Sequence, residues 1–117
     1  MRSREEIITL VEKIVVYQDK ICHQHYSKLE SSVYYFHNAL KGSLTSALYL
    51  LRSRVPLSDV VLSARIVLDA SKDHMGEYVT EVMRGHLTGC VIAINLCGGK
   101  QKIPAPSSSR LCVRYRG

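Results

Sequence analysis

The sequence predicts an all-α fold, an antiparallel helical hairpin with a long second helix and shorter helices after it. Apolar residues recur every three or four positions along most of the chain before Gly98, as on one face of a helix. Two Ser-x-x-Glu sequences, beginning at Ser3 and Ser27, have the form of a capping box, which marks a helix start. With 117 residues, 46% of them hydrophobic, the chain can bury one modest core. We expect one helical domain at residues 1–99.

The first two predicted helices have the clearest signals. Ser3 pairs with Glu6 in the first capping box, and a helix at about residues 4–23 follows. Its apolar stripe is Ile7, Leu10, Ile14, Tyr17 and Ile21, widened by Val11 and Val15. Ser27 with Glu30 begins a second helix that continues to the residue before Pro56, since proline disfavours helical conformation in the residue preceding it. Such a helix would be about 42 Å long. Because a small globule needs no helix of that length, we expect a homodimer in a four-helix-type bundle.

Shorter helices are predicted for the second half of the domain. Ser58 and Asp59 should cap a helix at about residues 59–71, and Asp73 should cap another. The residues expected to face inward are Val60, Val61, Ala64, Val67 and Leu68 in the former, and Tyr78, Val79, Val82 and Met83 in the latter. Thr88-Gly89 is expected to interrupt the last helix, and residues 90–97 fit either a buried helical turn or a strand. Gly98-Gly99 should end the domain, and residues 100–117, rich in Pro, Ser and Arg, should form a flexible basic tail.

The predicted second helix carries two stripes, both at helical spacing. The apolar stripe comprises Leu29, Val33, Phe36, Leu40, Leu44, Ala47 and Leu51. The polar stripe comprises Tyr34, Asn38, Lys41, Thr45, Tyr49 and Arg52. No Asp or Glu occurs from Ser31 through Ser58, a span that also holds Arg54. Such a surface suits a polyanion because nothing on it repels phosphate, so we predict that the polar stripe and Arg54 bind RNA. Alternatively, the stripe is an ordinary solvated face, and its tyrosines are core edges or dimer contacts.

Charge and cysteine usage place the chain in a broad class. The net charge of +6 comes from residues 82–117, which hold six basic and no acidic residues. Glu5, Glu6 and Glu12 interrupt any apolar core of a secretory signal, so we expect the four cysteines to be reduced thiols of a cytoplasmic protein. If the chain is viral, the compartment would be the host cytoplasm. The longest apolar run, residues 90–96, is far shorter than the roughly 20 residues of a membrane helix, and no membrane partner is expected.

No segment carries a recognisable catalytic or cofactor motif. Residues 22–25, Cys-His-Gln-His, invite a zinc site, but Cys90 and Cys97 lack the close spacing of a second ligand pair. Gly98-Gly99-Lys100 lacks the glycine spacing of a phosphate loop, and the carboxylates form no acid/base pair. We therefore expect a non-enzymatic protein without metal, cofactor or small-molecule substrate. Two alternatives to RNA binding stay open, a helical protein-interaction module and a small subunit of a larger assembly.

The layout resembles the nodaviral RNA-silencing suppressors, small basic proteins with a capped first helix and a long second helix ending at a proline. The likeness covers about residues 1–60. It is carried by Met1-x-Ser3-Arg4, Ile7-Ile8, Leu10, Lys13-Ile14, Phe36-His37 with Leu40, and Leu50-Leu51 ahead of Pro56. Two features depart from the family pattern: the long helix is less basic, and residues 60–97 are more hydrophobic.

The resemblance implies an all-α homodimer whose paired long helices lie along one face of double-stranded RNA. Such proteins bind without regard to sequence and shield viral RNA and small interfering RNA from Dicer and Argonaute. The family's RNA contacts are basic and small polar residues of the long helix, to which Lys41, Arg52 and Arg54 correspond in kind. A-form RNA has a wide, shallow minor groove lined with 2′-hydroxyls, which a straight helical face can contact.

Overall fold

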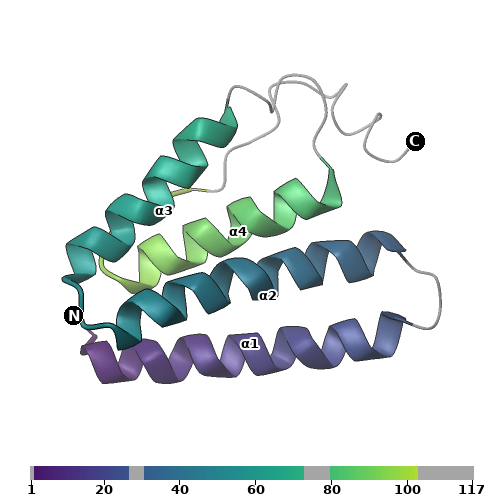
Figure 1. Cartoon of the computed structure of the whole chain (residues 1–117), viewed down its shortest axis with the longest axis horizontal. Helices are drawn as coiled ribbons and strands as arrows, with labels where there is room; N and C mark the ends of the chain where they lie inside the picture. Colours follow the sequence, from purple (N-terminus) through teal and green to yellow (C-terminus); the bar gives the residue numbers. More distant parts are fainter. Residues whose placement is uncertain (1, 27–30, 73–79, 103–117) are drawn as a thin grey trace.

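The computed structural model describes residues 2–26, 31–72 and 80–102 of the chain. These residues form four helices and no strand: α1 (Arg4–Tyr26), α2 (Ser31–Arg52), α3 (Leu57–Lys72) and α4 (Glu81–Leu96). Helix α2 lies between α1 and α4, and α3 packs against α4 (Figure 1). Helix α1 runs opposite to α2, whereas α4 runs in the same direction as α2 (Figure 1). The all-α class is confirmed for the described residues.

The predicted capping box begins α1. The backbone N–H of Glu6 donates to Ser3 Oγ at 3.2 Å, and the backbone N–H of Ser3 donates to Glu6 Oε1 at 3.2 Å. The helix continues to Tyr26, slightly beyond the predicted end. The second Ser-x-x-Glu sequence, residues 27–30, lies outside the described residues and includes Leu29 of the predicted apolar stripe.

Helix α2 ends earlier than predicted, at Arg52, and its described part has 22 residues. Arg54 adopts a left-handed conformation, with φ of 65°, and this ends the helix before Pro56. The Arg4 guanidinium donates to the carbonyl oxygens of Leu51 at 3.0 Å and Val55 at 2.5 Å, so two acceptors at the end of α2 are satisfied. At 1.5 Å per residue, α2 is about 33 Å long. The predicted continuation of the helix to the residue before Pro56 is wrong, whereas its predicted start at Ser27 lies outside the described residues.

Pro56, and not Ser58, starts α3. The backbone N–H groups of Asp59 and Val60 donate to the Pro56 carbonyl oxygen at 2.9 and 3.3 Å. Proline suits this place because its own missing N–H removes no helical hydrogen bond there. The helix therefore begins at Leu57, and Ser58 and Asp59 lie within its first turn instead of capping it.

Helix α4 is continuous where an interruption was predicted. It begins after Thr80, whose Oγ1 accepts the N–H of Met83 at 3.1 Å, whereas the predicted cap Asp73 lies outside the described residues with Tyr78 and Val79. Thr88-Gly89 lie in mid-helix, and the ambiguous segment 90–97 is helical as far as Leu96. A glycine stop follows α4: Gly98 has φ of 97°, and the Gly99 N–H donates to the Ile94 carbonyl at 2.9 Å.

The glycines of α4 allow it to lie very close to α2. A Cβ atom built on Gly85 would lie far inside van der Waals contact with the Phe36 carbonyl oxygen and 2.8 Å from Cβ of Ala39. A Cβ atom on Gly89 would lie 2.5 Å from Cβ of Ser43. The Ser43 hydroxyl donates to the His86 carbonyl oxygen at 3.2 Å across the same contact. Gly89 is thus present for helix–helix packing, which explains why it does not interrupt α4.

Two adjoining clusters of buried side chains form the core. The larger lies among α1, α2 and the ends of α3 and α4: Ile7, Val11, Leu40, Leu44, Leu48, Leu51, Val60 and Cys97. The smaller lies between α3 and α4: Leu68, Leu87, Val91 and Ile94. The predicted apolar stripe of α2 is confirmed for Leu40, Leu44, Ala47 and Leu51, all of which are buried.

Some side chains predicted to face inward are exposed. Tyr17 is 61% exposed because it lies at the edge of the α1 stripe, away from α2, the only helix that contacts α1 extensively among the described residues. Val67 of α3 and Val82 in the first turn of α4 are 46% and 43% exposed. A periodic pattern identifies the apolar side of a helix, but the number of neighbouring helices decides how much of that side is buried.

Substituting alanine for the helical glycines should distinguish glycines that a close helix–helix contact requires from a glycine that only lowers helix propensity. Gly85→Ala and Gly89→Ala should each lower the free energy of unfolding by about 1–3 kcal/mol, since the added methyl group overpacks the contact with α2. Gly42→Ala is the matched control, because a Cβ atom at Gly42 has nothing within 4 Å. The control should raise the free energy of unfolding by about 0.5–1 kcal/mol. Urea denaturation measures all three, and stabilisation by Gly85→Ala would contradict the close packing.

Candidate nucleic-acid interface

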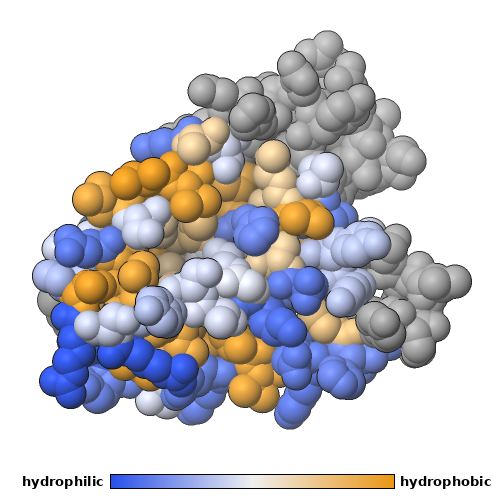
Figure 2. Space-filling model, in the orientation of Figure 1, coloured by the Kyte–Doolittle hydropathy of each residue, from blue (hydrophilic) through white to orange (hydrophobic). Residues whose placement is uncertain are grey.

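The predicted polar stripe divides into a solvent-facing part and a part beside α1. Asn38, Thr45 and Tyr49 are exposed, with Tyr49 at 72%. Tyr34 and Lys41 are half-buried on the side nearer α1. The exposed residues Tyr35, Gly42 and Ser46 extend the solvent-facing part, and together these six exposed residues are called the α2 outer face: Tyr35, Asn38, Gly42, Thr45, Ser46 and Tyr49. In Figure 2, residues over α2 are mainly pale or blue, whereas orange ones gather over α3.

Two carboxylates of α1 adjoin the polar stripe, which sequence reasoning did not anticipate. Lys41 Nζ lies 3.0 Å from Asp19 Oδ1, and Arg52 forms a hydrogen-bonded ion pair with Glu12. The hydrogen bond with Lys41 lowers the pKa of the Asp19 carboxyl and raises the pKa of the Lys41 ammonium. The absence of acidic residues within α2 therefore does not make the whole stripe free of negative charge.

Both ion pairs are open to solvent. The side chains are 31% exposed for Lys41 and 53% for Asp19, and 56% for Arg52 and 44% for Glu12. Exposed pairs of this kind contribute little to stability and are screened by salt. Both cations therefore remain accessible to another anion, which would have to compete with the α1 carboxylates.

The hydroxyl groups on the α2 outer face have a defined hydrogen-bonding direction. Thr45 Oγ1 donates to the Lys41 carbonyl oxygen at 2.7 Å, and Ser46 Oγ donates to the Gly42 carbonyl oxygen at 3.2 Å. Ser53 Oγ, one residue beyond α2, donates to the Tyr49 carbonyl oxygen at 2.8 Å. A hydroxyl has one hydrogen and two lone pairs, so each of these groups presents acceptor lone pairs to solvent. This arrangement suits a ligand that donates hydrogen bonds, such as a ribose 2′-hydroxyl.

Arg54 and the tyrosines occupy different settings. Arg54 is exposed but lies in the turn after α2, so it is not part of the helical stripe. The rings of Tyr34 and Tyr35 lie 5.6 Å apart with their planes tilted by 57°. Tyr49 lies on the outer face about four turns further along α2. The structure therefore brings the predicted residues to one side of α2, except for Arg54 at its end.

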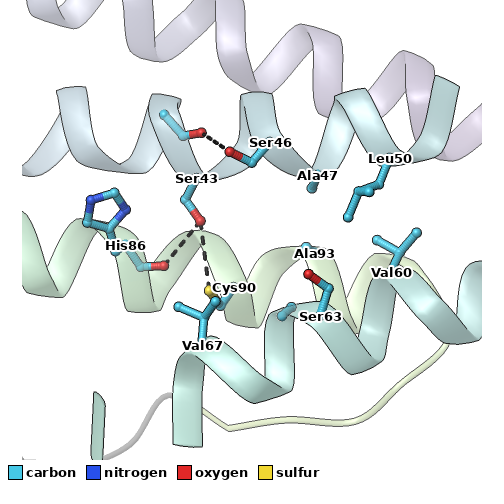
Figure 3. Close-up of a pocket in the computed structure, with 12 residues that line it drawn as sticks. Ser43, Ser46, Ala47, Leu50, Val60, Ser63, Val67, His86, Cys90 and Ala93 are labelled. Carbon is cyan, nitrogen blue, oxygen red and sulfur yellow. Dashed lines mark hydrogen bonds between the residues drawn. The ribbon is translucent and has the colours of Figure 1, made fainter. Parts of the chain in front are cut away.

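A groove lies between α2 and α3, with α4 as its floor. Its volume is about 170 Å³, and Figure 3 shows Leu50, Val60 and Val67 on its walls and Cys90 and Ala93 on its floor. The Ser43 hydroxyl lies 3.8 Å from Cys90 Sγ. His86 and Cys90 both line the groove, and these are residue types that can form a nucleophilic site. Burial, however, raises the pKa of the Cys90 thiol, which is opposite to the shift that a nucleophilic cysteine needs.

Two contacts between helices carried no signal recognised in the sequence. Gln18, only 6% exposed, is hydrogen-bonded to Nδ1 of His37 across the α1–α2 contact. Arg4 reaches the end of α2, as described above. The helical period places Gln18 beside Val11 and Cys22 on the buried side of α1, and this spacing could have identified it as a buried polar residue.

Comparisons with protein-family models, curated proteins and solved structures gave no match. Within the described ranges, no helix is long and apolar enough to cross a bilayer. The same ranges contain no group of three or more His, Cys, Asp or Glu residues arranged to hold a metal ion. The interface on α2 therefore has to be judged from its own geometry.

Thiol chemistry tests the packing beside this interface. Burial raises the pKa values of Cys22, Cys90 and Cys97 above the ordinary 9.0. We expect iodoacetamide at pH 8 to alkylate them much more slowly in the folded protein than in guanidinium chloride, measured by peptide mass mapping. Because the unfolded chain releases these protons at lower pH than the folded chain, stability should fall as pH rises through 9.0. Equal alkylation rates in both states would contradict this burial.

Proposed function

We propose that the chain binds double-stranded RNA without regard to sequence, through the α2 outer face with Lys41 and Arg52 at its edge. The observation that carries the proposal is an exposed helical face whose own residues include no carboxylate and whose hydroxyls present acceptors. By shielding long duplexes and small interfering RNA, such a protein would suppress RNA silencing, as the nodaviral resemblance implies. The activity needs no catalytic group, metal or cofactor.

The chemistry of A-form RNA supports this choice over DNA. Its shallow minor groove displays 2′-hydroxyl donors, which can meet the lone pairs of Thr45 and Ser46 without any change in their hydrogen bonds to α2. Gly42 and Ser46 are small, so a sugar–phosphate backbone can come close to this face. Lys41 and Arg52 are three helical turns apart on one side of α2, where they can contact phosphates.

A helical protein-interaction module is the second candidate, favoured by the groove between α2 and α3. The groove is lined by aliphatic and small side chains with serines among them, a surface that suits an apolar segment of a partner. It lies beside the α2 outer face, to which Ser46 and Gly42 belong as well. Because these two residues belong to both surfaces, only substitutions elsewhere, such as at Thr45 on the outer face or Val67 in the groove, distinguish nucleic-acid binding from partner binding.

Duplex binding tests the proposed function directly. An RNA duplex about 25 base pairs long, exceeding the ~16 base pairs that a double-stranded RNA-binding domain spans, should bind more tightly than the matching DNA duplex or single-stranded RNA. Thr45→Val with Ser46→Ala should weaken RNA binding by about 2- to 10-fold per hydroxyl while leaving DNA binding nearly unchanged.

Ser71→Ala is the matched control for these substitutions. Its hydroxyl makes the same type of bond, to the Val67 carbonyl oxygen at 2.9 Å, but it lies on α3. Gel shifts at near-physiological salt measure all of these affinities. Equal affinity for RNA and DNA would leave only a generic basic protein, and no duplex binding would favour the interaction module.

A homodimer is part of the proposal, and exposed apolar residues of α3 offer a surface for it. Leu40, Leu44 and Leu51 are buried within one chain, whereas Leu62 and Ile66 of α3 are 57% and 60% exposed. We expect sedimentation equilibrium to give twice the chain mass of 13.2 kDa, and Leu62→Glu with Ile66→Glu to return the protein to one chain. A single 13 kDa species for the unmodified protein at micromolar concentration would contradict dimerisation.

A further inference from the structure

Asp19 and Glu12 lie where they can oppose the binding of an anion to α2. Each makes an ion pair with a cation at the edge of the α2 outer face, Asp19 with Lys41 and Glu12 with Arg52. The two carboxylates are seven residues apart on α1, so they lie on the same side of that helix. The contact between α1 and α2 thus places two negative charges along one edge of the surface proposed to contact phosphates.

We infer that these two α1 carboxylates compete with RNA phosphates for Lys41 and Arg52 and thereby limit the affinity of the interface. The inference rests on the proposed function. When a phosphate pairs with Lys41 or Arg52, the carboxylate that was paired with that cation is left unpaired beside a polyanion. Part of the electrostatic gain from each phosphate contact is then lost, because the carboxylate repels the phosphate. The pairs therefore hold the cations in place on α2 while weakening their attraction for RNA.

The consequence is a measurable salt dependence. A cation that neutralises a phosphate adds about 0.9 to the magnitude of the slope of log K against log salt. With such a slope, lowering the salt concentration from 1 M to 0.15 M raises the affinity roughly fivefold for each contact. A cation already neutralised by a carboxylate contributes less than this. Removing both carboxylate charges should thus raise both the affinity and the slope.

The variants Asp19→Asn and Glu12→Gln test the inference. Singly, each should raise affinity for duplex RNA up to about fivefold, and together up to about 30-fold at 0.15 M salt. The slope should steepen by up to about 1.8 for the double variant. Adding Lys41→Ala and Arg52→Ala to the double variant should remove the gain, because the freed cations are then absent. Circular dichroism and urea denaturation check that each variant folds.

Asp69→Asn is the control for net charge. It makes the same change in charge on α3, which α2 and α4 separate from α1 (Figure 1). Its effect on RNA affinity should be much smaller than that of Asp19→Asn. An equal effect would show that overall charge, and not competition for Lys41, sets the affinity, and would overturn the inference.

Two further outcomes separate this inference from the proposed function. If the unmodified protein binds duplex RNA but the Asp19→Asn, Glu12→Gln double variant binds with the same affinity and slope, the competition is absent and the proposed function stands. If neither protein binds duplex RNA even at 50 mM salt, where phosphate contacts are strongest, the proposed function itself fails.

Discussion

The close approach of α2 and α4 determines which surfaces of the molecule are left open to solvent. Gly85 and Gly89 bring the α4 backbone against Phe36, Ala39 and Ser43, with no room for a side chain between the helices. Helix α1 covers the other flank of α2, so one long strip of α2 is left to solvent (Figure 1). The same approach makes α4 the floor of the groove, since α3 packs on its far side. Both candidate surfaces thus result from one helix–helix contact.

The charges of the interface belong to two helices and have to be considered together. Lys41 and Arg52 extend from α2 towards α1, and Asp19 and Glu12 extend from α1 to meet them. The solvent-facing residues between Asn38 and Tyr49 are uncharged, and the Thr45 and Ser46 hydroxyls, which donate to carbonyl oxygens of α2, leave their acceptor lone pairs to solvent. In the proposed function, recognition by such a surface would depend on shape and on 2′-hydroxyls more than on net attraction. That balance agrees with the modest number of cations on α2.

Most of the fold follows from local signals, whereas the errors come from contacts between distant segments. The Ser3–Glu6 capping box depends on residues three positions apart, and the sequence predicts it. The end of α2 was misplaced because it depends on the left-handed Arg54 and on Arg4, which lies 47 residues before Leu51. Gly89 suggested a break because its partner, Ser43, belongs to another helix.

The candidate interface was predictable in its residues but not in its electrostatics. Helical spacing alone places Asn38, Thr45 and Tyr49 on one face, and the structure exposes all three. Whether Lys41 is free depends on the rotation of α1, which decides where Asp19 falls. The periodic pattern of α1 fixes its buried side only to within a residue or two. No pattern within α2 could reveal that the nearest acids lie on another helix.

The parallel direction of α2 and α4 has a consequence for how the chain is connected. Two parallel helices cannot be joined by a short turn, because the chain must travel back along the full length of the first before starting the second. The 16 residues of α3 cover about 24 Å of that return. Helix α3 is therefore a spacer as well as a packing element. Its length contributes to the register in which Gly85 and Gly89 meet α2, so an insertion or deletion in α3 would act on that contact from a distance.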